Sequence, residues 1–357
     1  MQNINIKSYI TINNRSYTKE EVLKGSVGID PQLNEFLQQW WNNSMTLSVQ
    51  TSGSTGVPKK IEVLKSAMIT SASKTVQYFK LKPDMSALLA LPLTFIAGKM
   101  MVVRALVGGL NLITVTPSGN PLYWLSQSVD FAAFTPMQMM NELDKNSSKL
   151  QYLKLVIIGG GKVSDALNNR LQNVGFLAFE TYGMTETLSH VALRRINGSK
   201  PQTSFFPLDE VEMMIDAKGC LAIDFPGVTN ELVVTNDLAK FNQDGSFTLL
   251  GRADHVINSG GVKIFPEEVE GKLEGILEVP FIISALPHTK LGQQVILITE
   301  GDTSYSQEEL LSKIQKRVSK FEVPISIFSI KKISRTESGK VRRQEVLNQL
   351  QILLGNK

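Results

Sequence analysis

The chain of 357 residues contains a single cysteine, Cys220. One thiol cannot form a disulfide within the chain, and its isolation excludes the cysteine clusters that hold structural zinc. A composition without disulfides is typical of proteins that work in a reducing compartment. We therefore expect Cys220 to fill space in a strand.

Long apolar runs are also missing, since no stretch approaches the roughly 20 residues that cross a bilayer. The first ten residues, MQNINIKSYI, lack the basic flank, apolar core and cleavage site of a secretory signal. These absences predict a cytoplasmic protein without a membrane span. The formal charge is only +4 and the lysines are dispersed, which argues against nucleic acid as a partner and leaves an anionic small molecule open.

In the first half of the chain, short apolar runs alternate with helical stretches. The runs lie at 87–93, 110–116, 131–136, 153–160 and 175–183. Continuous apolar strands that alternate with helices predict a parallel sheet buried on both faces. Ahead of them, Asp30 and Pro31 are suited to cap and start an amphipathic helix. Its apolar face would carry Leu33, Phe36, Leu37, Trp40 and Trp41.

The second half of the chain has a different pattern of predicted strands and helices. From about residue 209, VEMMID, AKG and CLAIDF predict a hairpin within an antiparallel subdomain. Farther on, Ser306 and Glu309 form a capping box before a helix. The apolar face of that helix would carry Leu310, Ile314, Val318 and Phe321. We therefore expect an α/β fold with two parts, a large N-terminal α/β domain that includes the antiparallel subdomain (1–253) and a small α+β C-terminal domain (254–357).

The segment TSGSTGVPKK at 51–60 follows a predicted strand and combines hydroxyls, glycines and lysines. Glycines let backbone amides approach phosphate oxygens, hydroxyls add donors, and a lysine adds charge. The spacing differs from the GxxxxGK[ST] loop of nucleotide hydrolases. A flexible polar linker is the alternative, but linkers seldom join a strand to a helix, which VLKSAMITSASKTVQYF predicts here. The expected phosphate contacts are Thr51, Ser52, Gly53, Ser54, Thr55, Gly56 and Lys59.

A second polar turn, YGMTET, ends an apolar run at Gly183. Here Tyr182 can stack on a base, while Thr185 can reach a phosphate. Glu186 offers a carboxylate oxygen of the kind that Mg²⁺ prefers. The alternative is an ordinary turn at the end of a strand with a solvated glutamate.

Two other places offer groups for a nucleotide. Asp237 can accept hydrogen bonds from ribose hydroxyls, and Arg252 can donate to the same sugar or to a phosphate. Singly, each is as readily a surface charge. LKLVIIGGGKVSDAL runs from a strand through Gly159, Gly160 and Gly161 toward a helix, a shape that often holds phosphate, but it lacks the GxGxxG spacing of a dinucleotide site.

Five of these segments together resemble the adenylate-forming (AMP-binding) superfamily of acyl-CoA synthetases, aryl-CoA ligases, peptide-synthetase adenylation domains and luciferases. TSGSTGVPKK is similar to the first signature of that family. The others follow in the expected order, namely YGMTET (182–187), TNDLAKFNQDG (235–245), GRADHVINSGGVKIFPEEVE (251–270) and SRTESGK (334–340). One such match arises by chance, whereas five in order do not.

The resemblance implies a reaction in two steps. A carboxylate first joins the α-phosphate of Mg·ATP and releases pyrophosphate, and the thiol of coenzyme A then captures the acyl adenylate and releases AMP. Lys340 would be the catalytic lysine on a small mobile domain, acting with Thr185 and Glu186. Asp254 would be the hinge of that domain. Gly159, Gly160 and Gly161 would line the adenosine pocket, and Gly260 and Gly261 would let the pantetheine arm pass.

Two short sequence segments indicate which acid is the substrate. LPLTFIAGKMMVVRAL and YGMTETLSHVALRR resemble the short bacterial 2-succinylbenzoate-CoA ligases of menaquinone biosynthesis, and only about fifty residues precede the phosphate loop. Such an acid carries a second carboxylate that needs a cation. The candidates are Lys99, Arg104, His190, Arg194 and Arg195. The chain departs from many relatives at Thr94 and Phe95, where an aromatic residue and histidine are common, and at Lys60, where glycine is common.

Alternatives remain at this stage. A ligase for another aryl or acyl acid, or one that loads a carrier protein instead of coenzyme A, would have the same signatures. A non-catalytic nucleotide-binding protein could keep the fold, although Lys340, Glu186 and Asp237 argue against it. The sequence also leaves a homodimer open.

Overall fold

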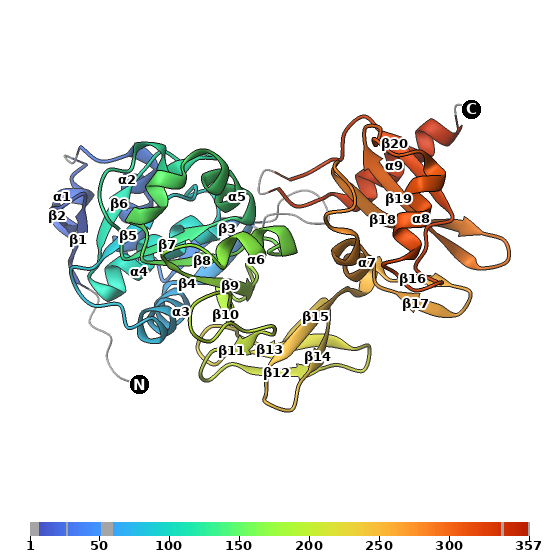
Figure 1. The fold of residues 1–357 in the computed structure, drawn as a ribbon. Helices are drawn as coiled ribbons and strands as arrows, with labels where there is room; N and C mark the ends of the chain where they lie inside the picture. Colours follow the sequence, from blue (N-terminus) through green and yellow to red (C-terminus); the bar gives the residue numbers. More distant parts are fainter. Residues whose placement is uncertain (1–6, 26–27, 51–59, 337–338, 356–357) are drawn as a thin grey trace. The chain divides into compact units, whose positions relative to one another are not determined.

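The structure is a computed structural model that describes residues 7–25, 28–50, 60–336 and 339–355 (Figure 1). The chain divides into two compact units. The first comprises Met1–Val163, Leu167–Met213 and Ile223–Val233, and the second comprises Ser164–Ala166, Met214–Ala222 and Val234–Lys357. In the described segments, no helix is long and apolar enough to cross a membrane.

The first unit contains a nine-stranded sheet with the order β11-β10-β9-β8-β7-β5-β6-β1-β2. Its strands are β1 (Tyr9–Ile12), β2 (Arg15–Thr18), β5 (Ser86–Leu89), β6 (Asn111–Thr114), β7 (Phe131–Phe134), β8 (Leu155–Ile158), β9 (Leu177–Gly183), β10 (His190–Arg195) and β11 (Phe206–Pro207). The pairs from β6 through β9 are parallel, as the continuous apolar runs predict. β10 runs antiparallel to β9, which brings the end of the YGMTET segment back along the sheet.

Helices and a small hairpin complete this unit. They are α1 (Lys19–Leu23), α2 (Pro31–Trp41), α3 (Lys65–Tyr78), α4 (Ile96–Gly108), α5 (Pro136–Lys145), the 3₁₀ segments η1 (Pro121–Trp124) and η2 (Ser147–Tyr152), and the strands β3 (Thr46–Gln50) and β4 (Lys60–Leu64); α6 (Asp165–Leu171) begins in the second unit. The prediction for α2 is confirmed, because the Asp30 carboxylate accepts from the amides of Gln32 and Leu33 at 3.0 Å. All five residues of its predicted apolar face are buried.

Helix α4 is apolar on every side and therefore buried, as its sequence IAGKMMVVRALVG requires. It packs against α3. Two charged residues depart from this pattern. Lys99 is half-buried, whereas Arg104 lies in the middle of the helix and exposes only 2% of its surface. The chain therefore places a guanidinium in the interior of its first unit.

A four-stranded sheet has the order β12-β13-β14-β15, and the boundary between the two units passes through its first three strands. The strands are β12 (Glu212–Ile215), β13 (Cys220–Asp224), β14 (Val233–Phe241) and β15 (Phe247–Arg252). The predicted hairpin is confirmed by the turn in which the Asp216 amide donates to the carbonyl of Cys220 at 2.8 Å. Cys220 is buried within β13, as expected.

The second unit is built on a sheet with the order β17-β16-β19-β18, in which β20 pairs with β19. Its remaining elements are η3 (Ala253–His255), β16 (Ile257–Ser259), β17 (Val262–Ile264), α7 (Pro266–Leu273), β18 (Phe281–His288), β19 (Gly292–Glu300), α8 (Gln307–Gln315), β20 (Ser326–Ile330) and α9 (Arg343–Gly355). Two apolar clusters pack on it, one with α7 and α8 and the other with α9. The unit is α+β, as the sequence predicts (Figure 1).

Helix α8 confirms the capping box of Ser306 and Glu309. It also buries Leu310 and Ile314. The predicted apolar face extends too far along the chain, however, because the helix ends at Gln315 and Phe321 is 56% exposed. The periodicity continued by chance into a segment that is not helical.

Candidate functional site

The predicted phosphate loop connects two paired strands. Thr51, Ser52, Gly53, Ser54, Thr55, Gly56 and Lys59 lie outside the described residues. Gln50 of β3 and Lys60 of β4 are opposite each other in the register, so the two ends of the loop meet. The expected strand–loop–helix order needs a correction, because the first residues of the predicted helix form β4 and α3 begins only at Lys65. β-branched and alternating residues in KIEVL favour that strand.

At the carboxyl end of β8, Gly159 is required by a close approach. A Cβ atom there would lie 2.2 Å from the hydroxyl of Thr181 on the neighbouring β9. That hydroxyl donates to the carbonyl of Ile158 at 3.2 Å. Gly160 has φ +80°, and Gly161 is exposed. The structure thus puts Gly159 beside the end of β9, while Gly160 and Gly161 face Thr135 and Pro136 at the start of α5. All three follow the carboxyl end of β8, at the edge of a parallel sheet where ligands commonly bind.

The YGMTET segment turns back at the same edge. A Cβ atom on Gly183 would lie 2.3 Å from the carbonyl oxygen of Ser189, so glycine is needed where β9 gives way to the turn. The hydroxyl of Thr187 holds the turn, accepting from the amide of Met184 at 3.1 Å. Tyr182 is only 8% exposed, and its ring lies 6.1 Å from that of Phe205.

Thr185 and Glu186 occupy the tip of this turn. Thr185 is half-buried and Glu186 is exposed. Over the described ranges, no three histidine, cysteine or carboxylate side chains gather into a metal site. The exposed carboxylate of Glu186 fits Mg²⁺ that arrives with a nucleotide, because Mg²⁺ is commonly bound by one or two carboxylates together with substrate phosphates.

Arg104 is the most unusual charge in the first unit. Its Nη2 donates to the hydroxyl of Ser189, and its Nε is buried without a hydrogen-bond partner in the part of the chain that is described. The ion pairs among the described residues do not include it. Burial lowers the pKa of Arg104 to about 10. A buried cation without an anion is costly, so this side chain is prepared for an anionic partner.

His190 extends the same cluster. Ser189 Oγ accepts from Arg104 and lies 3.4 Å from Nδ1 of His190, while Nε2 lies 3.2 Å from the hydroxyl of Thr75. Thr75 in turn donates to the carbonyl of Ser71 at 3.4 Å. This order is consistent when Nε2 carries the proton of a neutral ring. Burial, and next the charge of Arg104, hold the pKa of His190 well below its usual value.

The other predicted cations are already engaged. The guanidinium of Arg194 pairs with Glu180 on β9 at 2.7 Å, and Glu180 also accepts from the amide of Val163. Lys99 donates to the carbonyl of Ser48 at 3.0 Å, and burial lowers its pKa. Arg195 donates to the carbonyl of Asn197 at 2.9 Å. Of the predicted acid-binding cations, only Arg104 combines full burial with a donor that lacks a partner among the described residues.

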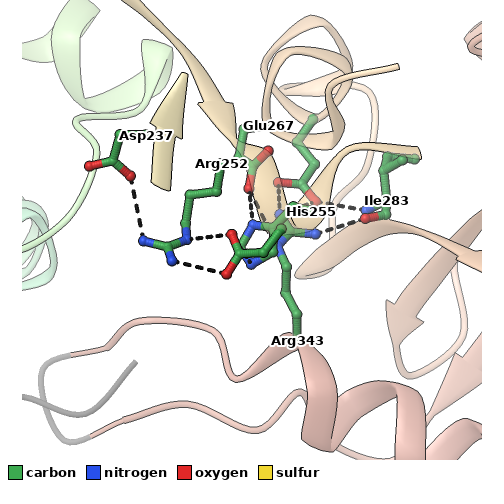
Figure 2. A network of polar contacts seen from close by, with 8 residues as sticks. Asp237, Arg252, His255, Glu267, Ile283 and Arg343 are labelled. Atoms are coloured by element: carbon green, nitrogen blue, oxygen red, sulfur yellow. Dashed lines mark hydrogen bonds and ion pairs between the residues drawn. The ribbon is translucent and has the colours of Figure 1, made fainter. Parts of the chain in front are cut away.

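In the second unit, Asp237 and Arg252 face each other across β14 and β15, as their shared prediction requires (Figure 2). Their ion pair measures 3.5 Å, and Arg252 also donates to both carboxylate oxygens of Asp254 at 2.9 and 3.0 Å. Burial alone would raise the pKa of Asp254, but Arg252 outweighs it and lowers that pKa. The predicted ribose-binding pair and the predicted hinge residue are therefore one cluster.

The remaining predicted residues lie in turns of the second unit. Gly260 and Gly261 join β16 to β17 with φ values of +57° and +84°, which glycine adopts without strain. Lys340 is half-buried, and its amide donates to the hydroxyl of Thr336 at 3.1 Å. Pattern alone missed Ser189, the partner of Arg104, although it directly precedes the predicted His190. Glu270 is the last residue of the predicted segment at 251–270, but no pattern in the sequence assigns it a role.

The sequence matches the family described as "AMP-binding enzyme" over residues 3–238. It is 24% identical to the 2-succinylbenzoate–CoA ligase of Lactococcus lactis subsp. lactis over 325 residues, which cover 85% of this chain and 71% of that protein.

Solved structures show the same similarity. An acyl-CoA synthetase (AMP-forming)/AMP-acid ligase II-like protein from Dyadobacter fermentans is 34% identical, with 89% of this chain and 93% of that chain covered and a TM-score of 0.60. The O-succinylbenzoate coenzyme A synthetase of Bacillus subtilis, in complex with ATP and magnesium ion, is 21% identical, with 85% and 70% covered and a TM-score of 0.72. At that identity the second likeness concerns the fold.

Proposed function

Because the chain belongs to the AMP-binding enzyme family, we propose that it is an ATP-dependent acid–CoA ligase acting on 2-succinylbenzoate. An oxygen of one substrate carboxylate attacks the α-phosphorus of ATP and pyrophosphate leaves. The thiol sulfur of coenzyme A then attacks the acyl carbon, and AMP leaves with the electron pair of the broken C–O bond. The names of the relatives, which are 2-succinylbenzoate–CoA ligases, support this choice of substrate.

The observation that carries the choice of acid is the buried, uncompensated charge of Arg104. A monocarboxylate has its only negative charge at the reacting centre. A diacid brings a second one, and a guanidinium binds a carboxylate through short, charge-assisted hydrogen bonds. We assign the second carboxylate to Arg104, with His190 as a neutral neighbour. Lys99 and Arg194, also predicted for this role, become supporting residues because their donors are engaged.

The nucleotide would be held by the loop at 51–59, by Gly159, Gly160 and Gly161, and by Tyr182. Asp237 and Arg252 would hold the ribose. Glu186 would be the protein ligand of Mg²⁺, which neutralises phosphate charge when it is bound. Thr185 would donate to the α-phosphate.

Lys340 would stabilise the charge that develops between carboxylate and phosphate. Gly260 and Gly261 would border the path of coenzyme A. We further propose a domain boundary between residues 253 and 254, with Asp254 as the hinge, and a cytoplasmic location for the protein.

The test measures pyrophosphate release from Mg·ATP with a panel of acids, and AMP formation with and without coenzyme A. We expect release with 2-succinylbenzoate and AMP formation that depends on coenzyme A. Two monoacids, each lacking one of the two carboxylates, belong to the panel because they should react poorly. If no acid released pyrophosphate, the enzyme assignment would be wrong. AMP formation that did not respond to coenzyme A would favour a carrier protein as acceptor.

A further inference from the structure

The segment that carries Lys340 is a tight turn in the second unit. Arg335 and Val341 form a β-bridge at its base. Thr336 binds Lys340 twice, since its amide donates to the Lys340 carbonyl at 2.8 Å and its hydroxyl accepts from the Lys340 amide at 3.1 Å. The backbone of Lys340 is therefore held from its N-terminal side. The position of this backbone then depends on what holds the other side.

On that other side, Arg343 is the first residue of α9 and is anchored by three oxygen atoms of two residues (Figure 2). Its Nη2 lies 2.7 and 2.6 Å from the two carboxylate oxygens of Glu270 on α7. Its Nη1 donates to the carbonyl of Ile283 on β18 at 2.7 Å. The start of α9 is thus tied both to a helix and to the central sheet of the unit.

The anchor is supported in turn by its neighbours. Glu270 also accepts from the amide of Ile283 at 2.7 Å. Burial raises the pKa of Glu270, and the charge of Arg343 opposes that shift. One turn earlier on α7, Glu267 lies 3.7 Å from Nε of Arg343 and 2.5 Å from Nδ1 of His255. Burial alone would raise the pKa of Glu267, but His255 and Arg343 outweigh it and lower that pKa.

From this geometry we propose that Arg343 and Glu270 are positioning residues for Lys340. Three residues of chain span at most about 11 Å, so a fixed Arg343 leaves the Lys340 backbone little freedom. A mobile lysine backbone would lower the fraction of molecules in which the ammonium reaches the reacting oxygens. This inference rests on the catalytic role proposed for Lys340, and it adds the contacts that hold that residue in position.

The competing explanation is an ion pair that only holds α9 onto the unit. A double-mutant cycle separates the two, because a positioning residue has nothing left to position once the lysine is gone. The variants are Arg343→Lys, Lys340→Ala and the combination of both. Arg343→Lys keeps the charge but loses the planar guanidinium and its paired N–H donors. Glu270→Gln, with and without Lys340→Ala, repeats the cycle from the other partner with a nearly isosteric change.

The rate measured is the single-turnover formation of the acyl adenylate, with thermal unfolding of each variant to confirm that it folds. We expect Arg343→Lys and Glu270→Gln to slow this step about 10- to 100-fold when Lys340 is present. In the Lys340→Ala background, the same changes should alter the residual rate by less than about twofold.

A matched control lies on the same helix, because Lys272 of α7 pairs with Glu322 at 2.6 Å and this pair includes neither Arg343 nor Glu270. Lys272→Gln should leave the rate unchanged. Equal losses from Arg343→Lys with and without Lys340 would overturn the positioning role and leave a structural ion pair. A wild-type rate in Lys340→Ala would instead refute the role proposed for the lysine itself, so the two failures are distinguishable.

Discussion

Replacing Arg104 with methionine should stabilise the free protein and abolish its preference for a diacid. Burial lowers the pKa of Arg104 from its usual value to about 10. At about 1.4 kcal/mol for each tenfold change in the proton equilibrium, this shift corresponds to about 3 kcal/mol. Methionine keeps most of the apolar volume and removes the charge. The lost hydrogen bond to Ser189 costs about 1–2 kcal/mol in return. The expected net gain in the free energy of unfolding is about 1–2 kcal/mol.

The assay is denaturant unfolding of wild type and variant without ligand, followed by the same titration with saturating 2-succinylbenzoate. A ligand that binds only the folded state raises the apparent stability. We expect this increase in the wild type and a much smaller one in Arg104→Met. In kinetics, the ratio of kcat/KM for the diacid to that for the monoacid that keeps the reacting carboxylate should fall toward one.

Arg194→Met is the matched control, since it removes a second, half-buried arginine, on β10. Arg194 is paired with Glu180, so its loss would leave a buried carboxylate without its cation. Breaking such a pair costs about 3–5 kcal/mol, the opposite sign from Arg104→Met. If Arg104→Met were destabilised as strongly as Arg194→Met and kept its preference for the diacid, Arg104 would be a structural residue and the choice of acid would lose its support.

Three further predictions follow from single residues. Because His190 is held neutral in the folded state while the unfolded chain binds a proton below about pH 6.5, wild-type stability should fall as the pH drops below that value. The pH dependence of unfolding should be shallower in His190→Gln, by up to about 1.4 kcal/mol per pH unit. Lys340→Ala should slow adenylate formation strongly while calorimetry shows ATP binding nearly unchanged; equal rates would contradict its role. Gly159→Ala places a Cβ 2.2 Å from the Thr181 hydroxyl, so thermal unfolding should show a loss of about 1–3 kcal/mol, whereas Gly28→Ala, which meets no atom within 4 Å, should not.

Local sequence patterns predicted those helices and strands that are determined by residues close together in the chain. Apolar runs bounded by glycine marked the parallel strands, and Asp30 and Ser306 marked the helix starts that they cap. The failures have local causes too. An apolar spacing that continued past Gln315 placed Phe321 on a helix that had already ended. Val63 and Leu64 were placed at the start of a helix, although they end the strand KIEVL, which pairs with TLSVQ.

The candidate site was predicted less completely, because its decisive contacts join distant residues. The sequence shows Arg104 and Arg194 as equal candidates for the second carboxylate. Only the register of β9 and β10 reveals that Arg194 lies opposite Glu180. The partners of Arg104 and His190, Ser189 and Thr75, are likewise brought together by the packing of α3 and α4 and by β10.

Arg104 and Arg343 can be assigned different tasks by asking where the charge of each is neutralised. Arg343 finds carboxylate oxygens and a backbone carbonyl within its own unit, so its charge is used to fix a segment in place. Arg104 finds a single hydroxyl and a neutral imidazole nearby, so its charge is neutralised only when an anion binds. The same criterion applies to stability, because removal of Arg343 should weaken the folded protein whereas removal of Arg104 should strengthen it. A pair of unfolding measurements therefore tests where each charge is neutralised, while the positioning role of Arg343 is tested by the double-mutant cycle with Lys340.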